Sequence, residues 1–497
     1  MALTQAATCD GVGAHLIDVQ VHISSGLPRV TVIGLADPVV ADSRERIRSA
    51  FATNALKWPD QRITIALSPA EQPKRGAELD LAIAVAILSA AGDLPAEALA
   101  EATFVGELNL DGTLRGGNRS FAIAGLISRT RPGSRVYVPA PDIDRWALVP
   151  GIRPVPITDI AELVAILRGE QVPTPVDRPT LPADTQLYEE LADVTGQFGA
   201  CQALEVAAAG GHHLLLSGQP GIGKTMLCQR FAGLLPPMSI AETLEVAAIR
   251  EVTNEAESAL SRRPPFRSPH HTSSHVAMVG GGHQARLRPG MVTQAHNGVL
   301  FLDEAPEFRR ESIEALRQPL ESGTVTIARS GLSATLPARF QLLMTQNPCP
   351  CGLAETPGGD CRCGPLARQR YENRLSGPLL DRVDLRLRVR PPVGTVAADR
   401  TAVVRDRIAA ARERGRPRLK KAGFTRNQQV TARILRKQWP VSAKVQDFVT
   451  DELGRTGASA RSRDKVLRVA WTIADLANSD QPSVDHAALA VTMRDPK

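Results

Sequence analysis

The first 170 residues alternate short apolar runs with polar turns, a pattern typical of a mixed α/β domain. Residues 62–67 alternate between polar and apolar positions and predict a strand. Residues 80–91 form an Ala-, Leu- and Ile-rich run that is too long for a typical strand and predicts a buried helix. Further strands are expected at residues 19–23, 30–33 and 136–139, and a short helix at residues 160–168.

Residues 171–186 contain four prolines and show no apolar periodicity. This composition is typical of an extended, semi-rigid linker, because proline fixes φ and removes a backbone donor. We therefore place a domain boundary here, after an N-terminal domain at residues 1–170.

The region after the linker, residues 187–392, predicts a parallel sheet covered by helices on both faces, because its apolar runs are continuous and alternate with helical segments. The expected strands are residues 213–217, 299–302 and 340–345, and the expected helices are residues 187–210 and 226–234. Residues 393–497 predict helices throughout, because apolar residues recur at three-to-four spacing, as at Val466, Val469, Ala470 and Ile473.

A glycine-rich segment follows the apolar run 213–217 and matches G-x-x-x-x-G-K-[ST] without deviation. In such a loop, glycines let backbone N–H groups surround phosphates, the lysine reaches the β- and γ-phosphates, and the threonine hydroxyl binds Mg²⁺. The strand before it and the helix after it provide the expected context. The predicted nucleotide-binding residues are Gly218, Gln219, Pro220, Gly221, Ile222, Gly223, Lys224 and Thr225.

Polar residues follow the next two predicted strands, where a parallel sheet presents groups to a ligand. Asp303 and Glu304 end the run 299–302, and Asn347 follows the run 340–345. We expect Asp303 to hold Mg²⁺ through water, Glu304 to orient and deprotonate the attacking water, and Asn347 to position that water. The alternatives are a surface Asp-Glu pair and an Asn that caps the turn before Pro348.

Composition is that of a soluble globular chain, with 43% hydrophobic and 22% charged residues. The longest apolar run, residues 81–91, is far shorter than the ~20 residues of a membrane span. The first residues carry no basic segment, so no secretory signal and a cytoplasmic location are expected.

Basic residues are concentrated in one segment. Residues 361–440 contain 21 Lys and Arg against 6 Asp and Glu, whereas the other 417 residues have a net charge of −8. A positive field of this kind attracts phosphate, either of a nucleotide or of nucleic acid.

Four of the seven cysteines lie within fifteen residues, as C-x-C-x9-C-x-C: Cys349, Cys351, Cys361 and Cys363. Four thiolates at this spacing could close a tetrahedral Zn²⁺ site, although C-x-C is tighter than the usual C-x2-C. The alternative is a loop of reduced thiols. His270, His271, His275 and His283 have no diagnostic metal spacing.

Longer motifs in the sequence resemble those of known protein families. The order of these motifs, with S-G-P-L-L-D-R-V-D-L at residues 376–385, resembles AAA+ ring ATPases of the magnesium-chelatase and MCM-type branch. P-F-R-S-P-H-H-T (265–272), A-H-N-G-V-L-F-L-D-E (295–304) and N-P-C-P-C-G (347–352) are similar to the ComM/YifB family. The resemblance implies an ATP- and Mg²⁺-dependent hexameric ATPase with a C-terminal helical lid at residues 393–497, acting on branched or single-stranded DNA.

The same resemblance assigns further residues. Arg382 would be an arginine finger that reaches the γ-phosphate of a neighbouring subunit, and Arg461 a sensor arginine acting in cis; otherwise both are structural or solvated arginines. Residues 263–290 would be an insertion in which Arg267, Arg286 and Arg288 contact DNA and Gly280, Gly281 and Gly282 are mobile.

The N-terminal domain resembles the Lon-protease-type fold. P-K-R-G-A-E at residues 73–78 lies where the catalytic serine motif occurs, and Glu78 stands at the serine position. Phe121 stands near the position of the catalytic lysine. A Ser-Lys mechanism needs a nucleophile and a base, so we expect no peptidase activity.

Two functions remain at this stage. The first is an ATP-driven ring motor for branch migration or unwinding of DNA. The alternative is a chelatase-like or chaperone-like ATPase that remodels a protein partner.

Overall fold

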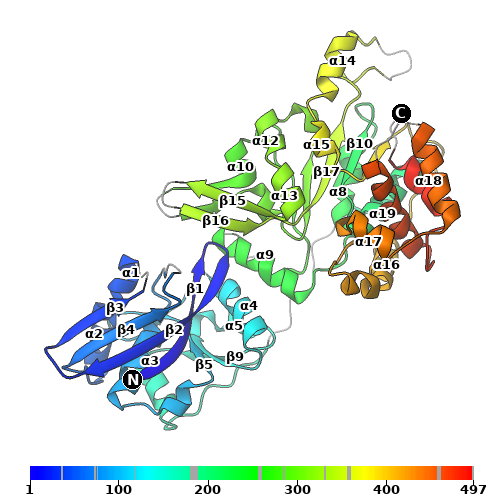
Figure 1. Cartoon of the computed structure of the whole chain (residues 1–497). Helices are drawn as coiled ribbons and strands as arrows, with labels where there is room; N and C mark the ends of the chain where they lie inside the picture. Colours follow the sequence, from blue (N-terminus) through cyan, green and yellow to red (C-terminus); the bar gives the residue numbers. More distant parts are fainter. Residues whose placement is uncertain are drawn as a thin grey trace. The chain divides into compact units, whose positions relative to one another are not determined.

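The chain divides into two units, each built on its own β-sheet (Figure 1). The structure, a computed structural model, describes residues 1–34, 37–71, 74, 76–117, 119–178, 188–253, 255, 260–283, 286–329, 332–354, 360–455 and 460–494. Unit 1 contains Met1–Asp184, Ser239–Ser261 and Gln284–Arg288, and unit 2 contains the rest. Of the linker predicted at residues 171–186, the part from residue 179 onward lies outside the described residues.

Unit 1 has a seven-stranded mixed sheet. Its strands, in spatial order, are β3 (Arg29–Ile33), β4 (Arg62–Ser68), β2 (Gly13–Ser24), β1 (Ala2–Asp10), β5 (Ala102–Phe104), β8 (Arg135–Pro139) and β9 (Arg153–Ile157). β2 is antiparallel to both β1 and β4, and the other neighbours are parallel. β6 (Glu107–Leu108) and β7 (Leu114–Arg115) form a separate pair.

Helices cover both faces of this sheet, because successive strand residues point to opposite sides. Ala6 of β1 belongs to the core that contains α3 (Asp80–Ala91), whereas Ala7 belongs to the core that contains α4 (Ser120–Thr130). α2 (Ser43–Thr53) and α6 (Ile160–Leu167) contribute to the first core, and α5 (Ile143–Ala147) to the second. α1 (Pro38–Ala41) precedes α2.

α3 confirms the buried helix predicted from its uniform hydropathy. Its first nine residues are buried. The one charged member, Asp80, is paired with Arg46, whose Nε lies 2.7 Å from an Asp80 carboxylate oxygen. Because a buried carboxylate is costly unless paired, this ion pair explains how an acid begins an otherwise apolar helix.

α9 (Ile240–Val252) lies in unit 1, although its sequence falls within residues 187–392, the region predicted to form the parallel sheet. Leu244 and Ala247 pack in the same core cluster as Phe121 of α4. The Glu251 carboxylate also accepts hydrogen bonds from the Phe121 amide, at 3.1 and 3.3 Å. This side chain therefore satisfies a free donor at the start of α4.

Unit 2 has a five-stranded sheet in which all neighbours run parallel, as predicted. The strand order is β11 (Phe266–Arg267), β14 (Val299–Leu302), β17 (Gln341–Gln346), β10 (Leu214–Ser217) and β18 (Leu385–Arg388). α7 (Phe198–Gly210) precedes β10, and α8 (Lys224–Leu234) follows it.

Shorter elements of unit 2 are inserted between these strands: α10 (His275–Val279), β12 (Gly280–His283), α11 (Met291–Gln294), α12 (Arg310–Glu314), α13 (Arg317–Ser322), α14 (Pro365–Glu372) and α15 (Gly377–Leu380). β13 (Arg286–Pro289) follows β12 in sequence, and all but its last residue belong to unit 1. β15 (Thr324–Arg329) and β16 (Leu332–Pro337) pair as an antiparallel hairpin.

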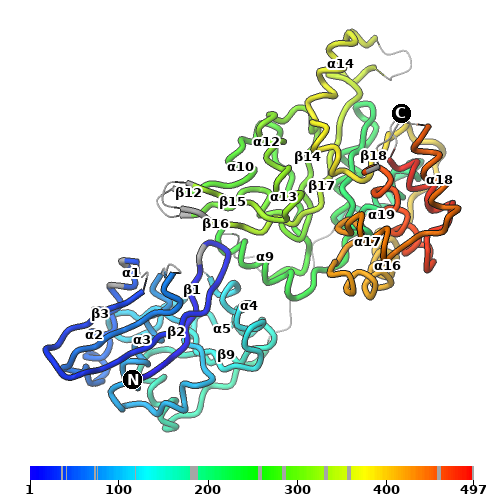
Figure 2. The backbone as a smooth tube through the Cα atoms, in the orientation of Figure 1, coloured from blue at the N-terminus to red at the C-terminus, as the bar shows by residue number. Residues whose placement is uncertain are grey.

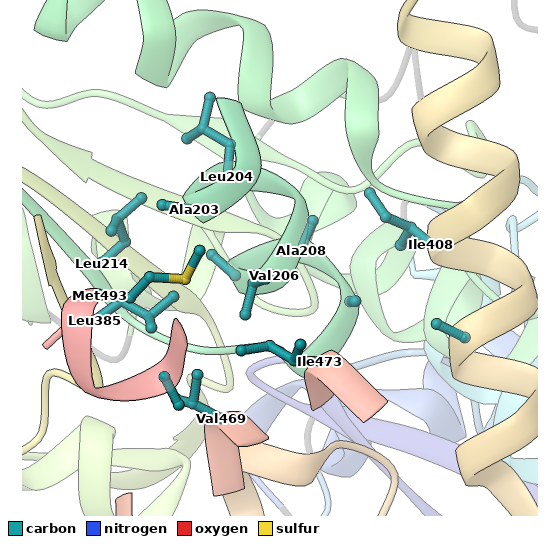
Figure 3. Packing of buried hydrophobic residues seen from close by; sticks show 14 of the residues in the cluster. Ala203, Leu204, Val206, Ala208, Leu214, Leu385, Ile408, Val469, Ile473 and Met493 are labelled. Atoms are coloured by element: carbon teal, nitrogen blue, oxygen red, sulfur yellow. The ribbon is translucent and has the colours of Figure 1, made fainter. Parts of the chain in front are cut away.

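The C-terminal region is helical, and it shares a core with the sheet. Its helices are α16 (Thr401–Lys421), α17 (Ala432–Lys437), α18 (Ala443–Arg455), α19 (Ala460–Leu476) and α20 (Val484–Thr492), and they gather at one end of unit 2 (Figure 2). Leu204 and Val206 of α7 belong to the same core cluster as Val469 and Ile473 of α19 (Figure 3). The helices are thus packed against the sheet unit.

The single helix predicted at residues 187–210 is wrong over its first part. Within its described residues, Leu191–Asp193 forms one 3-10 turn and the α-helix begins only at Phe198. Tertiary bonds hold the earlier segment: the Glu190 carboxylate accepts from the Thr401 hydroxyl at 2.7 Å, and Thr195 forms an isolated bridge with Ala397. These partners lie some two hundred residues away, so local sequence could not reveal them.

Candidate functional site

The glycine-rich segment forms the turn between β10 and α8, as its motif predicts. Gly221 and Gly223 have φ values of 76° and 92°, in the left-handed region that favours glycine. Gly223 caps α8, whose first residue is Lys224. The amides of the first helical turn therefore face the loop, which makes it a site for anions.

Lys224 is buried, and its ammonium group lies at the loop backbone. Its Nζ donates to the carbonyl oxygens of Gly218 and Gln219, at 2.7 Å each, and to Asn347 Oδ1 at 3.1 Å. Burial lowers the pKa of Lys224, and the charges of Asp303 and Glu304 oppose that shift. The nearby acids thus favour the charged ammonium that phosphate binding requires.

Asp303 lies opposite Thr225 across the same edge of the sheet. The Thr225 hydroxyl donates to one Asp303 oxygen at 2.9 Å, and the Thr345 hydroxyl donates to the other at 2.6 Å. A hydroxyl and a carboxylate are the hard oxygen donors that suit Mg²⁺. The residues predicted to hold Mg²⁺, Thr225 and Asp303, are therefore together and chemically suited to it.

Glu304 is exposed at the end of β14, with a left-handed backbone of φ 50° that is uncommon for a non-glycine residue. Its amide donates to the Thr345 hydroxyl at 2.8 Å. Asn347 Nδ2 lies 3.5 Å from a Glu304 carboxylate oxygen. Asn347 thus lies between Lys224 and Glu304.

Thr345 is a site residue that sequence reasoning missed. It is fully buried, and its hydroxyl joins the Asp303 carboxylate to the backbone of Glu304. The available signal was a threonine directly after the apolar residues 342–344, since a buried hydroxyl requires hydrogen-bond partners.

Arg382 follows α15 and is bound within its own chain. Its Nη2 lies 2.5 Å from a Glu321 carboxylate oxygen at the end of α13, and its Nη1 donates to the Pro378 carbonyl at 2.7 Å. Arg461, in the first turn of α19, is mostly exposed and lies 3.6 Å from Asp381. Among the contacts of the described residues, neither arginine reaches the phosphate loop, the glycine-rich segment at residues 218–225.

The four clustered cysteines come together in space. All four Sγ atoms lie within 4.8 Å of one another. Cys349 is buried, Cys351 is exposed, and Cys361 and Cys363 are half-buried. Residues 355–359, between the two pairs, lie outside the described residues. In the part of the chain that the structure describes, the histidines of residues 263–290 do not assemble a comparable ligand set.

The insertion predicted at residues 263–290 contains several short elements. Arg267 lies in β11, and Gly280, Gly281 and Gly282 lie in β12. Arg288 is exposed in β13. The side chains of Arg286 and His283 lie outside the described residues.

The protease-like positions of unit 1 have other surroundings. Glu78 is half-buried, and burial raises its pKa. Phe121 is buried in the α4 core. Lys74, also buried, donates to the Pro69 carbonyl, whereas Pro73 and Arg75 lie outside the described residues.

None of the described helices is both long and apolar enough to span a membrane.

Three family profiles match the chain in succession. Residues 19–141 match "Subunit ChlI of Mg-chelatase", residues 190–396 match "Magnesium chelatase, subunit ChlI", and residues 398–494 match "Magnesium chelatase, subunit ChlI C-terminal".

Similar proteins match over nearly the full length. An uncharacterised protein of Mycobacterium tuberculosis strain H37Rv is 43% identical, over 97% of this chain and 96% of its own. The YifB protein of Escherichia coli is 42% identical, over 97% and 95%, and the competence protein ComM of Haemophilus influenzae is 36% identical, over 99% and 97%. The chain therefore belongs to the magnesium-chelatase-like family that contains YifB and ComM.

Proposed function

We propose that this protein hydrolyses ATP with Mg²⁺ at the carboxyl edge of the unit 2 sheet. The observation that carries the proposal is that two sets of contacts meet at this edge: the Thr225 hydroxyl donates to Asp303, and Asn347 contacts both Lys224 and Glu304. Lys224 and the loop amides would hold the β- and γ-phosphates, and Thr225 and Asp303 the metal. Bound Mg²⁺ would neutralise charge on the phosphates.

Glu304 is the residue that we propose as the base. Its exposed carboxylate would accept a proton from water, while Asn347 orients that water toward the γ-phosphate. Deprotonation of water, in place of a substrate hydroxyl, would make the reaction a hydrolysis and not a kinase transfer. Family membership supports the same assignment.

Two variants test this assignment. Lys224→Ala should lose binding of a fluorescent ATP analogue, and Glu304→Gln should retain binding but lose hydrolysis by roughly 10²–10⁴-fold. Glu307→Gln, three residues further along, is the matched control and should hydrolyse ATP normally. Hydrolysis at the wild-type rate in either site variant would contradict the assignment.

We propose a homo-oligomer, most simply a hexamer, in which Arg382 completes the site of a neighbouring subunit. A cation at the γ-phosphate stabilises the transition state. Arg461 was expected in cis, but its partner Asp381 directly precedes Arg382. We therefore group Arg461 with Arg382, on the surface offered to a neighbour.

The proposed substrate of the motor is DNA, branched or single-stranded. The supporting points are the basic segment at residues 361–440 and the similarity to a protein named for competence. The second candidate is a chelatase-like or chaperone-like ATPase that remodels a protein partner, and the matching profiles are named for a magnesium-chelatase subunit. ATPase assays with four-way junction, single-stranded and duplex DNA separate the two. Absence of stimulation by every DNA form would favour the protein partner.

Mg²⁺ and Zn²⁺ would occupy different sites. The ATP site offers oxygen donors, whereas the cysteine cluster offers sulfur donors that suit Zn²⁺. Any Zn²⁺ therefore belongs to the cysteines and not to the hydrolytic step.

We also retain the prediction that unit 1 is not a peptidase, since Glu78 and Phe121 cannot supply a Ser-Lys pair. Casein degradation that requires unit 1 would contradict it.

A further inference from the structure

The sulfur positions of the cysteine cluster fit one tetrahedral metal ion. Sγ–Sγ distances are 3.4 Å for Cys349–Cys351, 3.7 Å for Cys349–Cys361 and 3.6 Å for Cys351–Cys361. Zn–S bonds of about 2.3 Å at tetrahedral angles put neighbouring sulfurs about 3.8 Å apart. A disulfide requires about 2.05 Å, so these sulfurs are too far apart to be bonded to one another. Four sulfurs within 4.8 Å enclose a single ion and leave no room for an iron–sulfur cluster.

The backbone of the first cysteine pair is shaped as a turn. Gly352 N donates to the Cys349 carbonyl at 3.0 Å, and Pro350 occupies the second turn position, where proline is favoured. Gly352 has φ 78° and needs glycine's freedom. The turn brings the Cys349 and Cys351 sulfurs to 3.4 Å from each other. The tight C-x-C spacing is therefore compatible with binding of both sulfurs to one metal ion.

A neighbouring arginine completes the surroundings of the sulfurs. Arg368, in α14, donates through Nη2 to Cys361 Sγ at 3.3 Å and through Nε to the Cys363 carbonyl at 3.0 Å. Four thiolates around one divalent ion carry a net charge of −2, and a guanidinium beside them offsets part of it.

The cluster also adjoins the phosphate loop. A Cβ placed on Gly352 would lie 2.3 Å from Cγ of Pro220, so the turn is in direct contact with the loop. Cys349 lies two residues after Asn347, whose Oδ1 accepts a hydrogen bond from Lys224 Nζ. The turn therefore links the cysteine cluster to the phosphate loop through Pro220 and to Lys224 through Asn347.

We propose that Cys349, Cys351, Cys361 and Cys363 bind one Zn²⁺, and that the bound ion fixes the 347–352 turn against Pro220 so that Asn347 and the phosphate loop keep their positions. Binding replaces up to four thiol protons, which leave to solvent, and involves no oxidation or reduction. The coupling to nucleotide rests on the proposed ATPase function, whereas the metal site does not.

Metal content tests the first half. Elemental analysis of the freshly purified full chain should find one zinc per chain, and Cys351→Ser and Cys363→Ser should bring it near zero. Cys201→Ala, which removes an isolated buried cysteine, is the control and should retain the zinc. Arg368→Gln should weaken zinc retention against a chelator by roughly 10–100-fold. Absence of metal from the wild-type chain, or iron with visible absorbance, would overturn the site.

Gly352→Ala tests the second half, because it disturbs the contact with Pro220 without removing a ligand. We expect full zinc content, but affinity for a fluorescent ATP analogue lowered by roughly 10–100-fold. Cys351→Ser should show the same loss of affinity. Wild-type affinity in both variants would overturn the coupling while leaving the zinc site intact. A wild-type chain that contains zinc but neither binds nor hydrolyses ATP would refute the proposed function. It would also refute the coupling to nucleotide, whereas the zinc site would stand.

Discussion

At the scale of single residues, Asn347 and Thr345 join the two halves of the candidate ATP site. Asn347 contacts both Lys224 and Glu304, and Thr345 contacts Asp303 and the Glu304 amide. Both lie at the end of β17, between the strands that carry the phosphate loop and the acids. The central position of β17 is therefore what brings the two motifs into one site.

Thr345→Val tests this role, because valine keeps the shape of threonine and removes only the hydroxyl. Asp303 and the Glu304 amide would each lose a partner, and we expect ATP turnover to fall by roughly 10–100-fold, as for outer-shell partners of metal ligands. Steady-state hydrolysis measures the effect. Thr326→Val in the exposed β15–β16 hairpin is the matched control, and an equal loss there would deny Thr345 a specific role.

At the scale of elements, part of the positive charge of residues 361–440 is paired with acidic side chains within unit 2. In α16, Arg407 pairs with Glu205 at 2.7 Å and with Asp399 at 2.6 Å. Arg418 pairs with Asp475 at 2.7 Å and lies over the rings of Trp439 and Trp471. These arginines stabilise the packing of the C-terminal helices. The positive charge of the segment is therefore weaker evidence for DNA binding than the sequence suggested.

α9 provides a prediction at this scale. Glu251→Ala removes the acceptor for the Phe121 amide and should lower the free energy of unfolding of unit 1 by about 1–2 kcal/mol. Chemical denaturation followed by tryptophan fluorescence measures it, since Trp146 belongs to the same core cluster. An unchanged denaturation midpoint would show that the cap contributes nothing.

The same residue gives a pH dependence. Burial raises the pKa of Glu251 from its ordinary value of 4.5 to about 8, with the Phe121 amide opposing the shift. A raised pKa means that the native state favours the protonated acid, so its contribution is complete below pH 4.5 and is lost as the pH rises to about 8. Glu251→Gln, which stays neutral and keeps an acceptor, should gain stability relative to wild type across that interval. A constant difference between the two proteins would contradict the shift.

At the scale of the whole molecule, the proposed trans role of Arg382 predicts complementation. Lys224→Ala lacks its own nucleotide site but keeps Arg382, and Arg382→Ala lacks the finger but keeps Lys224. Each should be inactive alone, and mixed rings should recover part of the activity, because intact sites then face intact fingers. If the mixture of Lys224→Ala and Arg382→Ala is no more active than the two variants measured separately, Arg382 acts within its own subunit.

Salt dependence provides a further test of the DNA proposal. If surface arginines release counterions from DNA phosphates, the logarithm of the binding constant should fall linearly with the logarithm of salt concentration. Fluorescence anisotropy with a labelled four-way junction measures the slope. A flat line would remove electrostatic DNA binding from the proposal.

Local sequence was sufficient for the elements with strong patterns. β14 and α3 occupy the expected residues, and the Gly-rich segment begins α8 as expected, because apolar periodicity and glycine conformations act over a few residues. β1, composed mainly of small residues, was not foreseen, since alanine and threonine carry little hydrophobic signal.

By itself, the sequence determined the parallel sheet of unit 2, the phosphate loop, the Asp303–Glu304 strand end and the four cysteines as a group. Only the tertiary structure decided that the Thr345 hydroxyl bonds to the Asp303 carboxylate and to the Glu304 amide, and that Arg461 pairs with Asp381. It also decided that Glu251 of α9 accepts from the first turn of α4, and that Gly352 contacts Pro220. The physical reason is distance along the chain: these contacts join residues tens to over a hundred positions apart, and they form only when packing brings the elements together.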